Sequence, residues 1–197
     1  RASWKDFPGF SAAVIGSVDG RAFGGTARVD ADGKVTLNID EQHATGWVED
    51  QLGSIVLHRR APAGQRPRPV LRFADQDTGH PLGRLLTFVG GAMASSYRVR
   101  NKQLTVVNRQ MGPLHMTITV LDNQKNADGR FLPRSYTVQY WNAKTGELDR
   151  TQSFQKRWRR VGSYDLPTRL TVTTASKTGL NVRSLSLEKH KLLPAAR

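Results

Sequence analysis

The chain has 197 residues, a formal net charge of +14 from 30 lysines and arginines against 16 aspartates and glutamates, and no cysteine. This length fits one domain whose core needs no covalent staples, and the missing cysteines exclude disulfides and thiolate metal centres. No apolar run approaches the ~20 residues of a membrane-spanning helix, so no transmembrane segment is expected.

Three strands are predicted near the N-terminus, because apolar and polar side chains alternate there. The alternation covers residues 10–18, 23–29 and 35–39. Two Asp-Gly pairs, at 19–20 and 32–33, separate these runs and are typical of two-residue hairpin turns. The segment is therefore expected to form a three-stranded antiparallel meander.

A helix is predicted next, because the hydrophobic period lengthens from two to about 3.6 residues after Asp40. The apolar residues between Ala44 and Val56 share one face, Asp40 is placed to cap the N-terminus, and the helix should end near His58. A second, shorter helix is expected over His80–Val89, with its apolar residues on one side.

A long antiparallel meander is predicted from Ser96 to Lys189, where most runs of six to ten residues alternate and turn residues separate the runs. Counted over the chain, about ten strands and two helices are expected. The economical architecture is one α+β domain over residues 1–197. In this domain a strongly curved antiparallel sheet, a half-barrel, carries the main helix and the short second helix across its concave side.

The best candidate for catalysis is the cluster of Asp75, Asp77 and His80, with Arg84 close by. Two carboxylates and an imidazole at this spacing could hold a metal ion or transfer protons. The same residue types are common in loops and at helix entries, so an enzyme at Asp75, Asp77 and His80 is an alternative beside a structural role. No other catalytic or cofactor-binding pattern is recognised, and neither enzymatic activity nor a cofactor is expected.

A curved sheet with helices across its mouth can enclose an apolar space, which points to a lipidic or other apolar ligand. The same side chains would equally fill an ordinary core, and the sequence does not separate the two. The residues predicted to line the space are Trp47, Val48, Leu52, Ile55, Met116, Ile118, Tyr136, Val138, Tyr140 and Trp158.

The positive charge favours anionic partners, such as a membrane surface, nucleic acid or acidic polysaccharide. The segment Lys156–Arg160 surrounds Trp158 with basic residues, a combination found in strands that bind nucleic acid. Strand alternation instead predicts that Trp158 packs inward with Phe154 while the arginines on either side face solvent. The candidates for an anion-binding surface are Arg98, Arg100, Arg157 and Arg159.

Short motifs spread over nearly the whole chain resemble an uncharacterised family of bacterial proteins, of a type associated with cyanobacteria and planctomycetes. The motifs are W-x-x-F-P-G-F (4–10), L-H-R-R (57–60), H-P-L-G-R (80–84), S-S-Y-R-V (95–99), V-N-R-Q-M-G (107–112), S-Y-T-V-Q-Y (135–140), V-G-S-Y-D-L-P (161–167) and H-K-L-L (190–193). This resemblance implies no known activity, and it assigns a role to no residue.

The order of elements is also similar to that of the outer-membrane lipoprotein carriers, with strands, a crossing helix and a long meander containing the step Leu166-Pro167. That resemblance implies an open half-barrel whose helices cover an apolar cavity, and which carries acylated or lipidic cargo outside the cytoplasm. It concerns the fold alone, so it bears on function only by analogy. The predicted function is a non-enzymatic carrier of an apolar ligand, with a module for anionic polymers as the alternative.

The start of the chain at Arg1 suggests a trimmed or mature form. If an export signal preceded it, an extracytoplasmic or periplasmic location would be favoured.

Overall fold

The computed structural model describes residues 4–59, 70–89 and 95–194. Over these residues the chain forms twelve strands and one α-helix, α1 (Thr45–Leu57), which follows a 3₁₀ turn, η1 (Gln42–Ala44). The strands are β1 (Gly9–Val18), β2 (Arg21–Asp30), β3 (Val35–Ile39), β4 (Leu71–Phe73), β5 (Arg84–Phe88), β6 (Ser95–Arg100), β7 (Gln103–Met111), β8 (Leu114–Lys125), β9 (Phe131–Asn142), β10 (Leu148–Val161), β11 (Tyr164–Ser176) and β12 (Gly179–Leu192).

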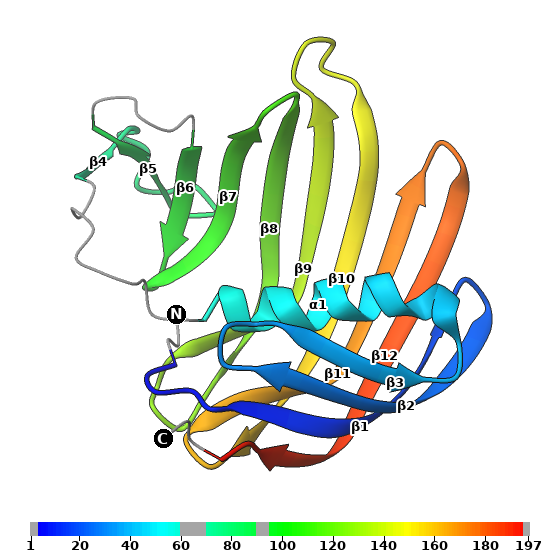
Figure 1. The fold of residues 1–197 in the computed structure, drawn as a ribbon. Coiled ribbons are helices and arrows are strands. Elements are labelled where there is room, and N and C mark those ends of the chain that lie inside the picture. The colour runs from blue at the N-terminus through cyan, green and yellow to red at the C-terminus, as the bar shows by residue number, and fades with distance from the viewer. Residues whose placement is uncertain (1–3, 60–69, 90–94, 195–197) are drawn as a thin grey trace.

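All of these strands belong to one antiparallel sheet in the order β3-β2-β1-β12-β11-β10-β9-β8-β7-β6-β5-β4. Neighbouring strands are also consecutive in sequence, except where β1 pairs with β12 and brings the two ends of the chain together. Within the described ranges β3 and β4 are edges that do not pair with each other, so the sheet stays open. Figure 1 shows the sheet curving into a half-barrel with α1 lying along its concave side.

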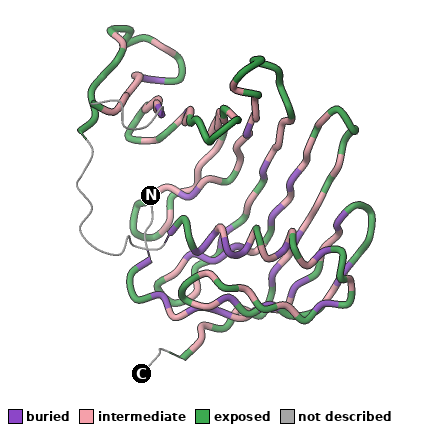
Figure 2. Tube along the Cα trace, turned by 45° about the horizontal axis from the view of Figure 1, so that its top comes forward, coloured by how far each residue is buried: buried purple, intermediate pink, exposed green. Residues whose placement is uncertain are grey.

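Helix α1 packs onto the concave face through Val48, Leu52 and Ile55, which are at most 4% exposed. These side chains share one core with inward-facing residues of the strands, including Phe10 and Leu185. The helix forms because its apolar residues recur at helical spacing, and burying them against the sheet stabilises it. The longer strands extend past the helix (Figure 1), and the exposed residues gather at their far ends and turns (Figure 2).

The structure confirms the main helix, but the capping residue at its start differs from the prediction. Glu41, rather than Asp40, caps η1, since its carboxylate accepts a hydrogen bond of 3.1 Å from the N–H of His43. Asp40 instead accepts a hydrogen bond of 2.8 Å from the N–H of Gly24 and so ties the start of the helical segment to β2. No helix in the described part of the chain is long and apolar enough to cross a membrane.

The second helix predicted over His80–Val89 is wrong, because this segment is a turn followed by β5. Gly83 has a φ of 85°, and a Cβ there would overlap the backbone carbonyl oxygen of Val99. The chain therefore leaves the helical region at Gly83 and passes close against β6. The described residues thus contain one helix rather than two, and twelve strands rather than about ten.

Candidate functional site

The part of the concave face beneath α1 is a filled core. Val48, Leu52 and Ile55 were predicted to line a ligand space, but they are 0%, 1% and 4% exposed. Side chains facing a void that admits water would keep more accessible surface than this. Val138 and Trp158 are likewise buried in the core, and Trp47 packs against it only in part. A ligand space therefore has to lie beyond the helix rather than under it.

A continuous row of apolar side chains crosses six strands on the concave face, and it is called the apolar row below. Directly opposed residues of neighbouring strands point to the same face of a sheet. Successive partners in the row are Phe73 and Leu86, Leu86 and Tyr97, Tyr97 and Val107, Val107 and Ile118, and Ile118 and Val138. The row begins at Val138, which is 4% exposed in the core, and ends at Phe73, which is 58% exposed on the edge strand.

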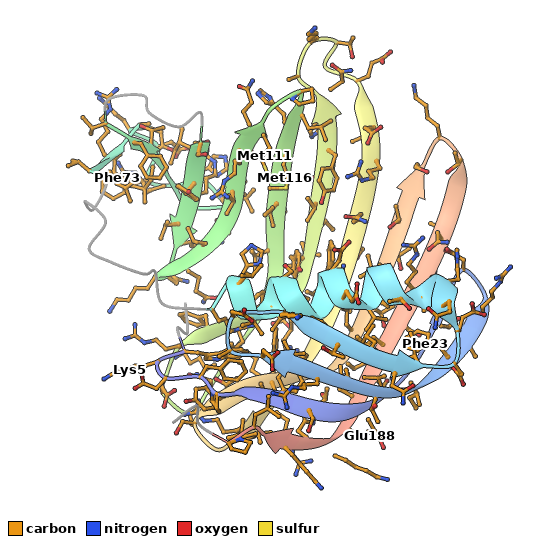
Figure 3. All side chains as sticks on the ribbon, in the orientation of Figure 1. Lys5, Phe23, Phe73, Met111, Met116 and Glu188 are labelled. Carbon is orange, nitrogen blue, oxygen red and sulfur yellow. The ribbon has the colours of Figure 1, made fainter. Side chains whose placement is uncertain are left out.

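The apolar row is widened by neighbouring residues of β8 and β9. Met116 lies opposite Tyr140, and both side chains are partly buried against the core. In Figure 3, Phe73, Met111 and Met116 lie on the part of the sheet that α1 does not cover. The predicted lining residues on β8 and β9 therefore join the core to the part of the concave face that α1 leaves uncovered, which is called the trough below.

An aromatic cluster lies beside Val138, at the inner end of the apolar row. The rings of Tyr136 and Phe154, opposite each other on β9 and β10, stack with centroids 4.7 Å apart and 6° between their planes. Lys156 Nζ lies 5.4, 5.8 and 6.0 Å from the ring centroids of Tyr136, Phe154 and Trp158. In the described ranges this ammonium group has no hydrogen bond or ion pair. Burial, and then the charge of Arg59, lower the pKa of Lys156 to about 8.

Arg59, just beyond the end of α1, adds a second cation to the cluster. Its guanidinium carbon lies 4.1 Å from the ring centroid of Trp158 and 5.4 Å from that of Trp4. Trp158 Nε1 donates a hydrogen bond of 3.0 Å to the carbonyl of Pro133. Trp4 Nε1 is buried without a hydrogen-bond acceptor among the described residues. The indole N–H of Trp4 is therefore a buried donor that an added acceptor could satisfy.

Lys156 and Arg59 were not among the predicted site residues. Strand alternation did place Lys156 on the inner face with Phe154 and Trp158, and a lysine at an inward position was the signal that could have identified it. Arg59 was interpreted only as a cation at the helix C-terminus. Its stacking on Trp158 depends on where the helix ends above the sheet.

Asp75 is the centre of a structural ion-pair network. It accepts hydrogen bonds of 3.2 Å from Arg84 Nε, 3.0 Å from Arg98 Nη1 and 3.0 Å from the N–H of Leu85. Burial opposes ionisation of this carboxyl, but the Leu85 N–H and the two guanidinium groups outweigh it and lower the pKa of Asp75. The network joins the segment after β4 to β5 and β6.

Asp77 and His80 have separate local partners. Asp77 accepts a hydrogen bond of 2.9 Å from the N–H of Gly79, and His80 Nδ1 accepts one of 3.1 Å from the N–H of Leu82. In the described part of the chain no three His, Asp or Glu residues converge as metal ligands. The contacts of Asp75, Asp77 and His80 are those of turns and strand ends, so they support no shared reaction centre.

The four candidate arginines for an anion-binding surface divide into two pairs. Arg98 is neutralised by Asp75, and Arg100 donates a hydrogen bond of 2.7 Å to the carbonyl of Pro81. Arg157 and Arg159 are exposed, as the alternation of β10 predicts, and Trp158 between them is buried. A shallow groove of about 540 Å³ on this outer face is lined by Arg157, Arg159, Thr168, Arg169, Ser186, Leu187, Glu188, Lys189 and His190.

Comparison with known proteins identifies the family. No curated protein and no solved structure matches the chain. The likeness to lipoprotein carriers and the association with particular bacterial groups therefore stay predictions. One family model, described as a protein of unknown function, DUF3386, matches residues 1–193. Because this match covers nearly the whole sequence, the chain belongs to the DUF3386 family.

Proposed function

We propose that this protein is a non-enzymatic binding or carrier protein for a lipidic ligand, whose apolar chain lies along the concave trough. The observation that supports this proposal is the apolar row from Val138 to Phe73. Five strand-to-strand spacings of ~4.8 Å make the row about 24 Å long. That length suits an extended acyl chain better than a compact ligand.

The burial along the row also favours a chain-like ligand. Its inner end is part of the core at Val138, while Phe73 and the neighbouring Leu71 on the edge strand are 58% and 46% exposed. Covering such side chains with an acyl chain would remove apolar surface from water, with a gain of about 25 cal/mol per Å². Figure 1 shows α1 crossing only part of the concave face, so the strands beyond it are not covered by the helix.

The test is binding of oleyl alcohol, an uncharged single-chain lipid, to the delipidated protein by isothermal titration calorimetry. Ile118→Glu puts a carboxylate in the middle of the apolar row and should weaken binding at least about tenfold, because the charge must be desolvated under the chain. Leu121→Glu on the same strand is the matched control, since Leu121 is 62% exposed and outside the row. Failure of the wild type to bind either oleyl alcohol or oleic acid, or equal loss of binding in both variants, would overturn the proposal.

A second candidate function is the binding of an anionic polymer to the outer face of β10 and β11. Arg157 and Arg169 lie directly opposite each other. In the described part of the chain neither they nor Arg159 form an ion pair. Like charges placed opposite each other on neighbouring strands are destabilising, and a bound polyanion would relieve the repulsion.

This candidate is tested by binding to a duplex DNA oligonucleotide, used as a generic polyanion, at several salt concentrations. Replacing Arg157, Arg159 and Arg169 together by glutamine should lower the slope of log affinity against log salt by about 2 to 3. Arg134→Gln is the control, because Arg134 is neutralised by Asp122 at 2.6 Å. An unchanged slope in the triple variant would rule out this face as the binding surface.

A further inference from the structure

We infer that the ligand of the concave trough is a single-chain amphiphile with an anionic headgroup, of which a long-chain fatty acid is the simplest, and that Lys156 binds this headgroup. The inference rests on the proposed function, because it assigns the headgroup end of the same trough. It goes beyond that function by naming the chemical class of the ligand and its anchoring residue.

The first argument is the position of Lys156. Its ammonium group lies over the rings of Tyr136, Phe154 and Trp158, at the inner end of the trough. Tyr136 lies next to Val138 on the same face of β9, so the lysine stands beside the start of the apolar row. A headgroup bound at Lys156 would therefore adjoin the inner end of a chain lying along the row.

The second argument is charge. A partly buried ammonium group is unfavourable unless an anion or hydrogen-bond acceptor compensates it. In the described residues Lys156 has neither, and its ring contacts supply only cation–π attraction. The charged and titratable groups identified around it are the guanidinium of Arg59 and the phenol of Tyr136. Neither is an anion near neutral pH, since a guanidinium is a cation and burial raises the pKa of Tyr136.

The third argument is the indole N–H of Trp4, a residue linked to the aromatic cluster through Arg59. The buried Nε1 of Trp4 has no acceptor among the described residues, and the guanidinium of Arg59 lies over the rings of both Trp4 and Trp158. A carboxylate or phosphate offers several acceptor lone pairs and a negative charge, which an alcohol or ester does not. The site therefore favours an anionic headgroup over an uncharged one.

The experiment compares oleic acid, oleyl alcohol and acetate by isothermal titration calorimetry with the wild type, Lys156→Met, Lys156→Arg and Lys125→Met. Lys125 is the matched control, because it is an exposed lysine whose Nζ lies 5.7 Å from a single ring, that of Phe131. We expect oleic acid to bind the wild type at least about tenfold more tightly than oleyl alcohol at pH 7. Lys156→Met should abolish this preference, while Lys156→Arg and Lys125→Met should keep it.

A second measurement reports on the ammonium group itself. The pKa of Lys156 is about 8 without ligand. A bound carboxylate stabilises the charged ammonium form and so raises the pKa of Lys156. Binding of oleic acid at pH 8 should therefore be accompanied by uptake of about half a proton by the protein. The uptake appears as a binding enthalpy that changes with the ionisation enthalpy of the buffer. It should vanish in Lys156→Met and persist in Lys125→Met.

The outcomes separate this inference from the function on which it rests. Equal affinity of the wild type for oleic acid and oleyl alcohol would overturn the assignment of Lys156 and leave the trough as a site for uncharged lipids. Binding of neither lipid would overturn both. Binding of acetate as tightly as oleic acid would show an anion site that does not use the trough, and would overturn the proposed amphiphile.

Discussion

The rings of Tyr136 and Phe154 stack across β9 and β10 with centroids 4.7 Å apart, and Lys156 Nζ lies within 6 Å of both. This arrangement places a cation on an aromatic surface of the core, beside the inner end of the apolar row. Such a position is unfavourable for the protein alone and favourable for a complex with an anion. The free energy of unfolding of the ligand-free protein should therefore depend on Lys156.

Lys156→Met should stabilise the ligand-free protein by up to about 3 kcal/mol at pH 7. The pKa of Lys156 in the folded protein, about 8, lies well below the ordinary value for lysine, which means that the folded protein disfavours the charged form by about this amount. The unfolded chain holds a proton on Lys156 up to about pH 10.5, whereas the folded chain loses it above about pH 8. Unfolding then takes up a proton in this window, and the wild type gains stability as the pH rises.

The check is urea unfolding of the wild type and Lys156→Met between pH 7 and pH 10.5. The difference between their free energies of unfolding should shrink across this range and be nearly gone at its upper end. Lys125→Met should follow the wild type throughout. A difference that stays constant with pH would show that Lys156 titrates as an ordinary surface lysine.

Phe154→Ala should lower the free energy of unfolding by about 3 to 5 kcal/mol, because the ring is buried and stacked. Tyr136→Phe keeps the stack and should change stability by less than about 1 kcal/mol. Gln155→Ala is the control on the opposite, exposed face of β10, with an expected change within about 0.5 kcal/mol. Equal effects of Phe154→Ala and Gln155→Ala in urea unfolding would contradict the inner position of Phe154.

Gly83→Ala should destabilise the β4–β6 end of the sheet by about 2 to 3 kcal/mol, since residue 83 has a positive φ and no room for a Cβ. Gly79→Ala is the matched control, because a Cβ there meets only the Asp77 carboxylate at an ordinary distance of 3.5 Å. Hydrogen exchange of the amides of β5 and β6 measures the effect directly. Slow exchange in both variants would mean that β5 does not pass against β6 as described.

Asp75→Asn should loosen the same end of the sheet, because Arg84, Arg98 and the N–H of Leu85 all donate to this carboxylate. The pKa of Asp75 is lower in the folded state, so its contribution is present above about pH 4 and is lost as the pH falls through the folded value. The free energy of unfolding of Asp75→Asn should fall less steeply than that of the wild type as the pH is lowered. The amides of β5 should exchange faster in the variant. Asp77→Asn, which touches only its own turn, should behave like the wild type.

Sequence alternation predicted much of the sheet, because a strand with one buried face repeats its apolar residues every second position. It placed Trp158 and Phe154 inside and Arg157 and Arg159 outside, and the structure confirms this. It failed at β5, where a few leucines and a valine fit a short helix as well as a strand. There Gly83 decided the outcome through its contact with Val99, a residue far along the chain.

The sequence by itself determined the antiparallel meander, the crossing helix and the inward direction of Lys156, since each follows from local periodicity. Only the tertiary structure decided that the predicted lining residues of α1 fill a core, and that the apolar row continues from that core at Val138 to the edge strand at Phe73. The physical reason is that the apolar row depends on the register of six strands, and that the cation cluster depends on the place where Arg59 meets Trp158. Both features join residues that are far apart in the sequence, so the local pattern of a single segment does not encode them.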